Sequence, residues 1–412
     1  MVIFMVESVE DRFLRYVKID TQSQYDIDKV PSSDKQFTLA KLLVEELKTL
    51  GLTDAEVDDH SYVMATLPAS PGLEEKSVLG LIAHMDTSPD APGKANPMIW
   101  KNYDGKEIKL PKGDVVISPN ENPELKNYIG QNIITSDGES LLGADDKAGV
   151  AEIMTALEIM ANDTSIKHGK IRVAFTPDEE VGKGTEFFDV GKFGAKFAYT
   201  IDGGELGEVE NETFNAQTAK IKFKGYNVHP GYAKGKMKNS IKAAGYFITL
   251  LPTNITPETT EGWEGYLHPN SLNGSVEETV IKVLIRDFKD EGMKEKKRIL
   301  EDIKKKVMEK HLGIEVDIEI KESYKNMKIV LDEHPDVLGI AMEACKRAGV
   351  EPKLKNIRGG TDGAKLCFMG IPTPNIFAGG INFHGKKEFI PIQSMEKAVK
   401  VIIEITKLVA EK

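Results

Sequence analysis

The sequence predicts an α/β protein whose main domain is interrupted by a smaller α+β domain, and three observations support this fold class. The chain has 412 residues, more than one hydrophobic core usually supports, so two domains are expected. Its first half alternates short apolar runs with helical patterns, as α/β domains do. After Glu212 the order of elements becomes β-α-β-β-α-β, the ferredoxin-like order, and the α/β pattern returns near Pro335.

The elements of the main domain are predicted from the spacing of apolar residues. Helices are expected where apolar residues recur every three or four positions, at residues 34–50, 147–157, 335–347 and 394–409. Gly51 ends the first of these, because glycine readily adopts the conformation that follows a helix. Buried strands are expected where a run is mainly apolar, at residues 77–83, 170–175 and 197–201.

The insert is assigned to residues 213–324, which leaves residues 1–212 and 325–412 for the main domain. Its strands are predicted at residues 217–223, 262–267, 279–288 and 314–322, and its helices at residues 237–251 and 291–312. The second helix alternates Lys and Glu at helical spacing, as a solvated helix face does.

Composition excludes several classes of function. The chain has 65 acidic and 54 basic residues and a net charge of −11, whereas nucleic-acid binding needs a basic face. No run approaches the ~18 apolar residues of a membrane span, and the apolar N-terminal start lacks the basic region and cleavage site of a signal peptide. Cys345 and Cys367 stand alone in apolar stretches, which predicts buried, reduced thiols. We expect a cytoplasmic protein without nucleic-acid or membrane partners.

Residues of metal-ligand type gather at the ends of predicted strands and at one helix start. The groups are His84 with Asp86, Asp145 with Asp146, Glu179 with Glu180, and Asp202 alone. Ligands of open α/β sheets bind beyond the carboxyl ends of the strands, so these groups are expected to converge. Carboxylates gathered at one edge repel one another. A bound divalent cation removes that repulsion.

The residue types favour zinc, because imidazole and carboxylate ligands are present and thiolates are not. Five such groups with one shared carboxylate suit two metal ions about 3.5–4 Å apart. The fifth group must come from elsewhere in the chain. His384 is the best candidate, because it follows an apolar run and a glycine pair that suggest a tight loop at the sheet edge.

Seven short motifs then resemble a known family. They are HMDT, GADDKAG, TPDEEVG, TIDGGELGE, NVHPG, RGGTDG and NFHGKKEF, and they run from His84 to Phe389 in family order. The chain resembles the peptidase T family of the dinuclear-zinc aminoacylase and carboxypeptidase clan. The resemblance implies an aminopeptidase that releases the N-terminal residue from tripeptides. It also implies a catalytic domain with a mixed, mainly parallel sheet, interrupted by a ferredoxin-like lid and dimerisation domain, in a homodimer.

The resemblance also assigns metal ligands. It implies that His84 and Asp202 bind one zinc ion, that Glu180 and His384 bind a second, and that Asp145 bridges the two. Two zinc ions per chain are therefore expected. Co²⁺ or Mn²⁺ could replace zinc, since carboxylate-rich sites discriminate poorly between these metals.

Two further acidic residues acquire roles in the same way. The spacing alone leaves open which of Glu179 and Glu180 is the base, and the resemblance implies that Glu179 is. It implies that Asp86 orients His84, which agrees with the need of a ligating imidazole for an acceptor on its other nitrogen.

Three residues are candidates for substrate binding. His229 matches a family histidine that reaches the active site of a neighbouring subunit, where it would polarise the scissile carbonyl. The alternative is a simple turn residue before Pro230. Arg286 and Arg358 suit bidentate capture of a peptide carboxylate. The alternative for Arg286 is an ion pair with Asp287 or Asp290.

Other functions stay open within and outside the clan. A dipeptidase or an N-acyl amino acid deacylase would use the same metals with a different pocket. A catalytically silent, metal-dependent peptide-binding protein is a rival of another class, but it would have no reason to retain Glu179 and Asp86. A structural-zinc scaffold is excluded because such sites are typically rich in cysteine.

Overall fold

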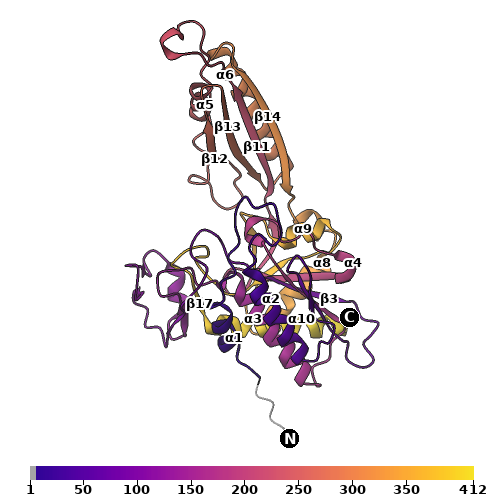
Figure 1. Cartoon of the computed structure of the whole chain (residues 1–412). Helices are drawn as coiled ribbons and strands as arrows, with labels where there is room; N and C mark the ends of the chain where they lie inside the picture. Colours follow the sequence, from indigo (N-terminus) through magenta and orange to yellow (C-terminus); the bar gives the residue numbers. More distant parts are fainter. Residues whose placement is uncertain (1–5) are drawn as a thin grey trace. The chain divides into compact units, whose positions relative to one another are not determined.

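The computed structural model describes residues 6–412 (Figure 1), so most of the apolar N-terminal start lies outside the described residues. The chain divides into two compact units. The first contains the chain up to Asn211 together with Ile329–Lys355 and Thr361–Lys412. The second contains Glu212–Lys328 and the short segment Asn356–Gly360.

The first unit is built on an eight-stranded mixed sheet, which confirms the predicted fold class. Its order is β1-β2-β8-β3-β9-β16-β10-β15. The four strands β8, β3, β9 and β16 are parallel neighbours at its centre. The bounds are β1 (Glu56–Val57), β2 (Val63–Leu67), β8 (Ile171–Thr176), β3 (Leu79–His84), β9 (Phe197–Gly203), β16 (Asn375–Phe377), β10 (Glu208–Thr213) and β15 (Lys353–Ile357).

Helices cover both faces of this sheet. Successive side chains of a strand point to opposite faces, so a strand with apolar residues at successive positions contributes to a core on each face. On β3, Leu79 and Leu81 enter the larger core, whereas Ile82 enters a smaller one on the other face. The larger core packs against α1 (Val9–Tyr16), α2 (Gln36–Thr49), α3 (Ala144–Asn162), α8 (Pro335–Arg347) and α10 (Ile392–Glu411). The smaller core includes residues of α4 (Val190–Phe193) and α9 (Asp362–Phe368).

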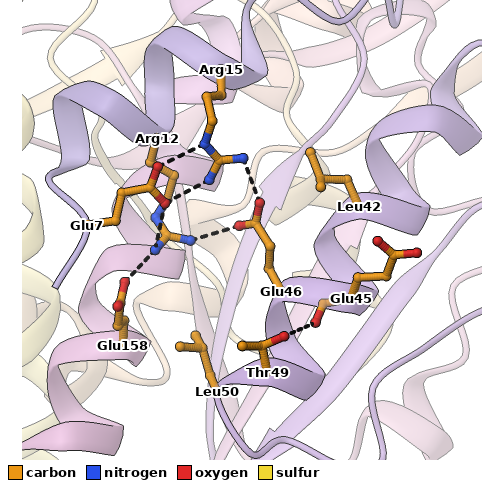
Figure 2. Close-up of a pocket in the computed structure, with 9 residues that line it drawn as sticks. All are labelled: Glu7, Arg12, Arg15, Leu42, Glu45, Glu46, Thr49, Leu50 and Glu158. Atoms are coloured by element: carbon orange, nitrogen blue, oxygen red, sulfur yellow. Dashed lines mark hydrogen bonds and ion pairs between the residues drawn. The ribbon is translucent and has the colours of Figure 1, made fainter. Parts of the chain in front are cut away.

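A buried cation joins three of these helices. Arg12 on α1 has a side chain only 4% exposed and contacts Glu46 of α2 at 2.9 Å and Glu158 of α3 at 2.5 Å. Figure 2 shows this group together with Arg15, which bridges Glu7 and Glu46. Pairing a buried charge in this way avoids the cost of leaving it unpartnered. The network fixes α1 against α2 and α3.

Two smaller sheets complete the first unit. One has the order β17-β7-β4, with bounds β17 (Phe389–Pro391), β7 (Ile133–Thr135) and β4 (Met98–Trp100). The other pairs β5 (Ile108–Lys109) with β6 (Val116–Ile117). Because β17 pairs antiparallel with β7, the chain just after His384 lies beside the chain that leads into α3.

The second unit is an antiparallel four-stranded sheet with two helices. Its chain order is β11 (Asn215–Lys224), α5 (Ser240–Thr249), β12 (Tyr266–Gly274), β13 (Glu278–Asp287), α6 (Asp290–Lys310) and β14 (Glu315–Tyr324). The strands lie in the order β12-β13-β11-β14 (Figure 1), and both helices contact the sheet. This is the predicted ferredoxin-like arrangement. The strand expected at residues 262–267 begins instead at Tyr266.

The predictions about cysteines and membrane spans can be compared with the described residues. Cys345 and Cys367 are both free and buried, as predicted. Within residues 6–412, none of the helices combines the length and the apolar character needed to cross a membrane.

Candidate active site

Five side chains of the first unit converge as two groups that share one carboxylate. One group contains His84, Asp145 and Asp202, and the other contains Asp145, Glu180 and His384. In each group one potential ligand atom per residue lies within 4.8 Å of the others. These are the five residues expected to hold metal, and Asp145 is the one expected to be shared.

The parallel sheet explains why these residues meet. His84 ends β3, the Glu180 turn follows β8, and Asp202 lies near the end of β9. Because these strands are parallel neighbours, their carboxyl ends share one edge of the sheet. Asp145 lies at the start of α3, next to that edge. His384 comes from the loop before β17.

Asp145 presents one oxygen to each imidazole. Its Oδ1 lies 2.8 Å from Nε2 of His84, and its Oδ2 lies 3.3 Å from Nε2 of His384. On one side, Nε2 of His84 is also 3.4 Å from Asp202. On the other, Nε2 of His384 is 2.8 Å from Glu180. The two groups therefore have the same composition, with one imidazole, one terminal carboxylate and the shared carboxylate.

Asp86 is buried behind the first group and makes contacts in two directions. Nδ1 of His84 lies 3.1 Å from the backbone carbonyl oxygen of Asp86 and 3.3 Å from its Oδ1, which leaves Nε2 to face the rest of the group. Asp86 also accepts the backbone N–H groups of Glu179 at 3.0 Å and Glu180 at 3.3 Å. Asp86 thus fixes both the imidazole and the Glu179–Glu180 turn.

The Glu179–Glu180 turn is held from its other side by Asp178. This residue has φ of 52° and is fully buried. Its carboxylate accepts hydrogen bonds from the hydroxyl of Ser32 and the side-chain amide of Gln36, both at 2.6 Å. The turn is therefore fixed by bonds that do not involve the glutamate side chains themselves.

The electrostatics of this cluster fit a cation. Burial raises the pKa of Glu180 to about 8 and raises the pKa of Glu179 and Asp202 as well. Hydrogen bonds to Asp145 and Glu180 raise the pKa of His384 to about 11. One buried oxygen of Glu180, Oε1, has no hydrogen-bond partner within the described chain. Imidazole and carboxylate donors around an unmatched buried oxygen suit divalent metal ions.

Sequence reasoning missed two buried residues that support the centre. Glu388 is 1% exposed and accepts the backbone N–H groups of Leu142, Gly143 and Asp145 at 2.7–3.1 Å. Lys147 is fully buried, donates to the carbonyl of Ile19 at 2.7 Å, and has a pKa lowered by burial to about 8. Both residues lie inside quoted motifs, NFHGKKEF and GADDKAG. Both were missed because their burial could not be seen from the sequence.

Gly149 allows α3 to approach β9 closely. A Cβ at this position would lie 1.9 Å from the carbonyl oxygen of Ile201 and 2.5 Å from the Asp146 carboxylate. Real Cβ atoms do not approach other atoms this closely, so only glycine fits without a shift of backbone. The contact brings the start of α3, with Asp145, to the strand that carries Asp202.

All three predicted substrate-binding residues belong to the second unit, whereas the five candidate ligands belong to the first. His229 is exposed, and its Nδ1 accepts the backbone N–H of Gly231 at 3.2 Å. The Arg286 guanidinium donates to the carbonyls of Gln217 and Ile285, each at 3.0 Å. The neighbouring carboxylate of Asp287 forms its ion pair with Lys296 at 2.6 Å.

Arg358 holds the segment that precedes β12. Its Nη1 donates to the carbonyls of Gly262 at 3.0 Å and Glu264 at 2.7 Å, and its Nη2 donates to the Thr260 hydroxyl at 2.9 Å. The guanidinium also lies 5.2 Å from the ring centre of Phe214. Arg358 therefore has a structural role in the second unit.

Comparisons with known proteins agree on one family. The model described as Peptidase family M20/M25/M40 matches residues 134–407. A protein named peptidase T from Clostridium acetobutylicum is 54% identical over 411 residues, which is 99% of this chain and 100% of that one. A peptidase T from a Geobacillus species is 52% identical over 410 residues, again 99% of this chain and 100% of the relative.

Solved structures show the same fold. An aminopeptidase PepT from Bacillus cereus superposes with a TM-score of 0.75 at 23% identity, over 98% of this chain and 99% of that one. A tripeptidase from Staphylococcus aureus gives a TM-score of 0.74 at 24% identity, over 98% of both chains. A dinuclear metal-binding peptidase from Bacillus subtilis gives 0.63 at 14% identity, over 98% of both chains.

Proposed function

The chain belongs to peptidase family M20/M25/M40 and is a peptidase, and we propose that it is a di-zinc aminopeptidase that releases the N-terminal residue from tripeptides. The observation that carries this proposal is the pair of ligand groups that share Asp145. The tripeptide preference is supported by relatives named peptidase T that match over the full chain. The name tripeptidase of a protein with the same fold also supports it.

We assign His84 and Asp202 to one metal ion, Glu180 and His384 to the other, and Asp145 to both. Zinc suits imidazole and carboxylate ligands, although Co²⁺ or Mn²⁺ can replace it at sites of this kind. When bound, two such ions act as Lewis acids on the peptide carbonyl and lower the pKa of water toward ~7.

Glu179 is the proposed general base. Its backbone is fixed by Asp86 at 3.0 Å, and burial raises the pKa of its carboxyl well above the ordinary value. A carboxylate with a raised pKa is better suited to take a proton from the attacking water. As the water oxygen bonds to the carbonyl carbon and the C–N bond breaks, Glu179 passes this proton to the leaving amine. Asp86 keeps Nε2 of His84 turned toward the ligand group.

His229 is the proposed donor to the carbonyl oxygen. Its imidazole is exposed and lies on the second unit, whereas the ligands lie on the first. By analogy with the family, we propose that His229 acts on the active site of a partner subunit in a homodimer formed through the second unit. This residue would stabilise the negative charge that develops on the carbonyl oxygen.

Arg286 and Arg358 are the proposed partners of the substrate's C-terminal carboxylate. Arg286 donates through Nη1 to two backbone carbonyls. Arg358 uses both Nη1 and Nη2 for bonds within its own unit. A carboxylate at Arg358 would have to replace these bonds, so Arg286 is the stronger candidate.

We also propose a cytoplasmic location without nucleic-acid or membrane partners. The two free, buried cysteines are consistent with a reducing compartment. The net charge of −11 opposes binding to a phosphate backbone.

The function is tested by hydrolysis of a matched series: Ala-Ala, Ala-Ala-Ala, Ala-Ala-Ala-Ala and N-acetyl-alanine. We expect preferential cleavage of the tripeptide, with alanine and Ala-Ala as products, and loss of cleavage after chelation. Preferred cleavage of Ala-Ala would indicate a dipeptidase, and preferred cleavage of N-acetyl-alanine a deacylase. Metal-dependent binding of peptides without cleavage of any of them would indicate a silent binding protein.

A further inference from the structure

An aminopeptidase has to recognise a free α-amine, which is largely protonated near neutral pH because its pKa is about 8. The inference below therefore rests on the function proposed above. A positive charge beside a partly buried site requires an anionic partner. The carboxylates that bind metal are already committed, so the partner is sought among carboxylates that contact a ligand without being one.

Asp90 is such a carboxylate. Its Oδ2 lies 3.6 Å from Nδ1 of His384. The other nitrogen of that ring, Nε2, faces Asp145 and Glu180. The Asp90 side chain is 49% exposed, so a ligand arriving from solvent can reach it.

The other carboxylates of this kind in the described chain are closed to solvent. Asp86 and Asp146 are 0% exposed, and Glu388 is 1% exposed. Each already accepts backbone N–H groups: Asp86 from the Glu179–Glu180 turn, Asp146 from His84 and Glu388 from Asp145. A substrate amine cannot reach any of the three.

Two further contacts hold the side chain and the backbone of Asp90 in place. The hydroxyl of Tyr25 donates to its Oδ1 at 3.1 Å, and the backbone N–H of Asp90 donates to Ser88 Oγ at 3.3 Å. Gln22 donates from its side chain to the Ser88 carbonyl at 3.3 Å, which joins this loop to the segment that carries Tyr25. Burial and the nearby Asp90 raise the pKa of Tyr25 to about 12, so its hydroxyl stays a neutral donor.

The length of a peptide limits where its amine can bind. The α-nitrogen lies two bonds, or roughly 2.5 Å, from the scissile carbonyl carbon, and a charge-assisted hydrogen bond adds about 2.8 Å. A peptide whose carbonyl lies at the ligand groups therefore needs a carboxylate roughly 5 Å from that carbon. Asp90 lies at Nδ1 of His384, whereas Nε2 of the same ring faces the ligand group, so a peptide that extends from the ligand group along this ring brings its α-ammonium group toward Asp90. We propose that Asp90, held by Tyr25, binds the α-ammonium group of the substrate.

If Asp90 only orients His384, its substitution has different effects from those expected of an amine-binding residue. A carboxylate beside Nδ1 of His384 could serve only to orient that ring, as Asp86 does for His84. Loss of an orienting residue would reduce metal content or turnover for every substrate. Loss of an amine-binding residue would weaken only ligands that carry the amine.

The test uses the metal-loaded enzyme and compares Asp90→Asn with wild type. The substrate is Ala-Ala-Ala, and propionyl-Ala-Ala, which has hydrogen in place of the amine, serves as an inhibitor. We expect Asp90→Asn to raise KM for Ala-Ala-Ala roughly 10- to 100-fold, the loss expected for one charge-assisted hydrogen bond. Both kcat and the metal content should remain close to wild type. The inhibition constant of propionyl-Ala-Ala should not change.

Two further variants complete the test. Asp90→Glu keeps the charge and should recover part of the lost affinity. Asp104→Asn is the matched control, because it changes an exposed carboxylate that pairs with Lys106 at 2.9 Å, and it should behave as wild type. The inference is overturned if Asp90→Asn loses metal, lowers kcat at unchanged KM, or weakens both ligands equally. If wild type does not cleave Ala-Ala-Ala, the proposed function fails instead.

Discussion

Asp145 differs electrostatically from the carboxylates around it. Although burial opposes ionisation, hydrogen bonds from His384 and His84 hold the pKa of Asp145 well below its ordinary range. For Glu180 and Asp202, burial dominates and raises the pKa. Without metal, the site therefore has one stable anion, flanked by acids that resist ionisation. Bound cations would ionise Glu180 and Asp202 as well, so metal binding should release protons.

The neighbouring residues Glu179 and Glu180 should respond differently to the same change. Glu179→Gln should keep both metal ions but lower turnover by ~10²–10⁴, the range expected for loss of a general base. Glu180→Gln should lose metal as well as rate, because it removes a ligand oxygen 2.8 Å from His384. Elemental analysis and kcat, measured on the same preparations, check both expectations.

Each glutamine variant serves as the control for the other, because both preserve shape within one turn. Near-normal turnover of Glu179→Gln at full metal content would contradict its role as base. Full metal content in Glu180→Gln would contradict its role as ligand.

Among single residues, those whose roles follow from residue type and spacing could be predicted from the sequence. His84 and Asp86 are two positions apart at a strand end, and the structure places them in contact. Glu388 could not be found in this way, because its partners are backbone N–H groups, which any sequence supplies. Lys147 was missed for a different reason, because lysine is ordinarily a surface residue and its burial was not expected.

At the level of elements, the site depends on how closely α3 approaches the sheet. In Figure 1, α3 lies against the sheet, where it contacts both β3 and β9. Most residues of α3 are therefore buried, and they include acidic residues. Glu152 is one of them: it is 0% exposed, and neither carboxylate oxygen has a hydrogen-bond partner within the described chain.

Glu152 should make the stability of the protein depend on pH. Burial raises the pKa of its carboxyl well above the ordinary value, so the folded state holds a proton that the unfolded state releases. This contribution to stability is fully present below the unfolded pKa and is lost as pH rises toward the folded pKa. The slope is at most about 1.4 kcal/mol per pH unit. Thermal unfolding at pH 5 and pH 8 measures it.

Two substitutions separate charge from polarity at this position. Glu152→Gln cannot titrate, so its melting temperature should gain on that of wild type as pH rises from 5 to 8. Glu152→Leu also removes the unpaired polar atoms and should be more stable than wild type by ~1–3 kcal/mol at pH 8. Equal pH dependence of wild type and Glu152→Gln, at matched metal content, would show that this carboxyl does not titrate on unfolding.

Elements were predictable where burial imposes a pattern. The strands β3, β8 and β9 have mainly apolar sequences, and α8 shows clear helical spacing, so all four were located within two residues of their bounds. The edge strand β12 was misplaced because polar residues such as Asn270 and Asn273 give it no apolar signal. The three-stranded sheet was missed because strands of three residues are too short to show a period.

At the scale of the whole molecule, the proposal divides the active site between subunits. A mixture of His229→Ala and Glu179→Gln tests this division, since both variants should be nearly inactive alone. A mixed dimer would contain one site with an intact Glu179 from one chain and an intact His229 from the other. Random reassociation should therefore restore about a quarter of the wild-type activity. Refolding the two variants together and assaying Ala-Ala-Ala measures the recovery.

The control is each variant refolded alone, which should stay inactive. If mixed dimers form but activity does not return, His229 acts within its own chain or only shapes the turn before Pro230. A chain that remains monomeric at assay concentrations and is fully active would also contradict donation between subunits.

The claim that two metal ions held around Asp145 drive catalysis is tested most directly by metal titration. Metal-free protein is titrated with Zn²⁺, and bound metal per chain is measured together with cleavage of Ala-Ala-Ala. We predict that activity is absent without metal and reaches its maximum close to two bound ions per chain, whereas Asp145→Asn binds less and stays inactive. Full peptidase activity in metal-free protein, or in Asp145→Asn, would contradict the account.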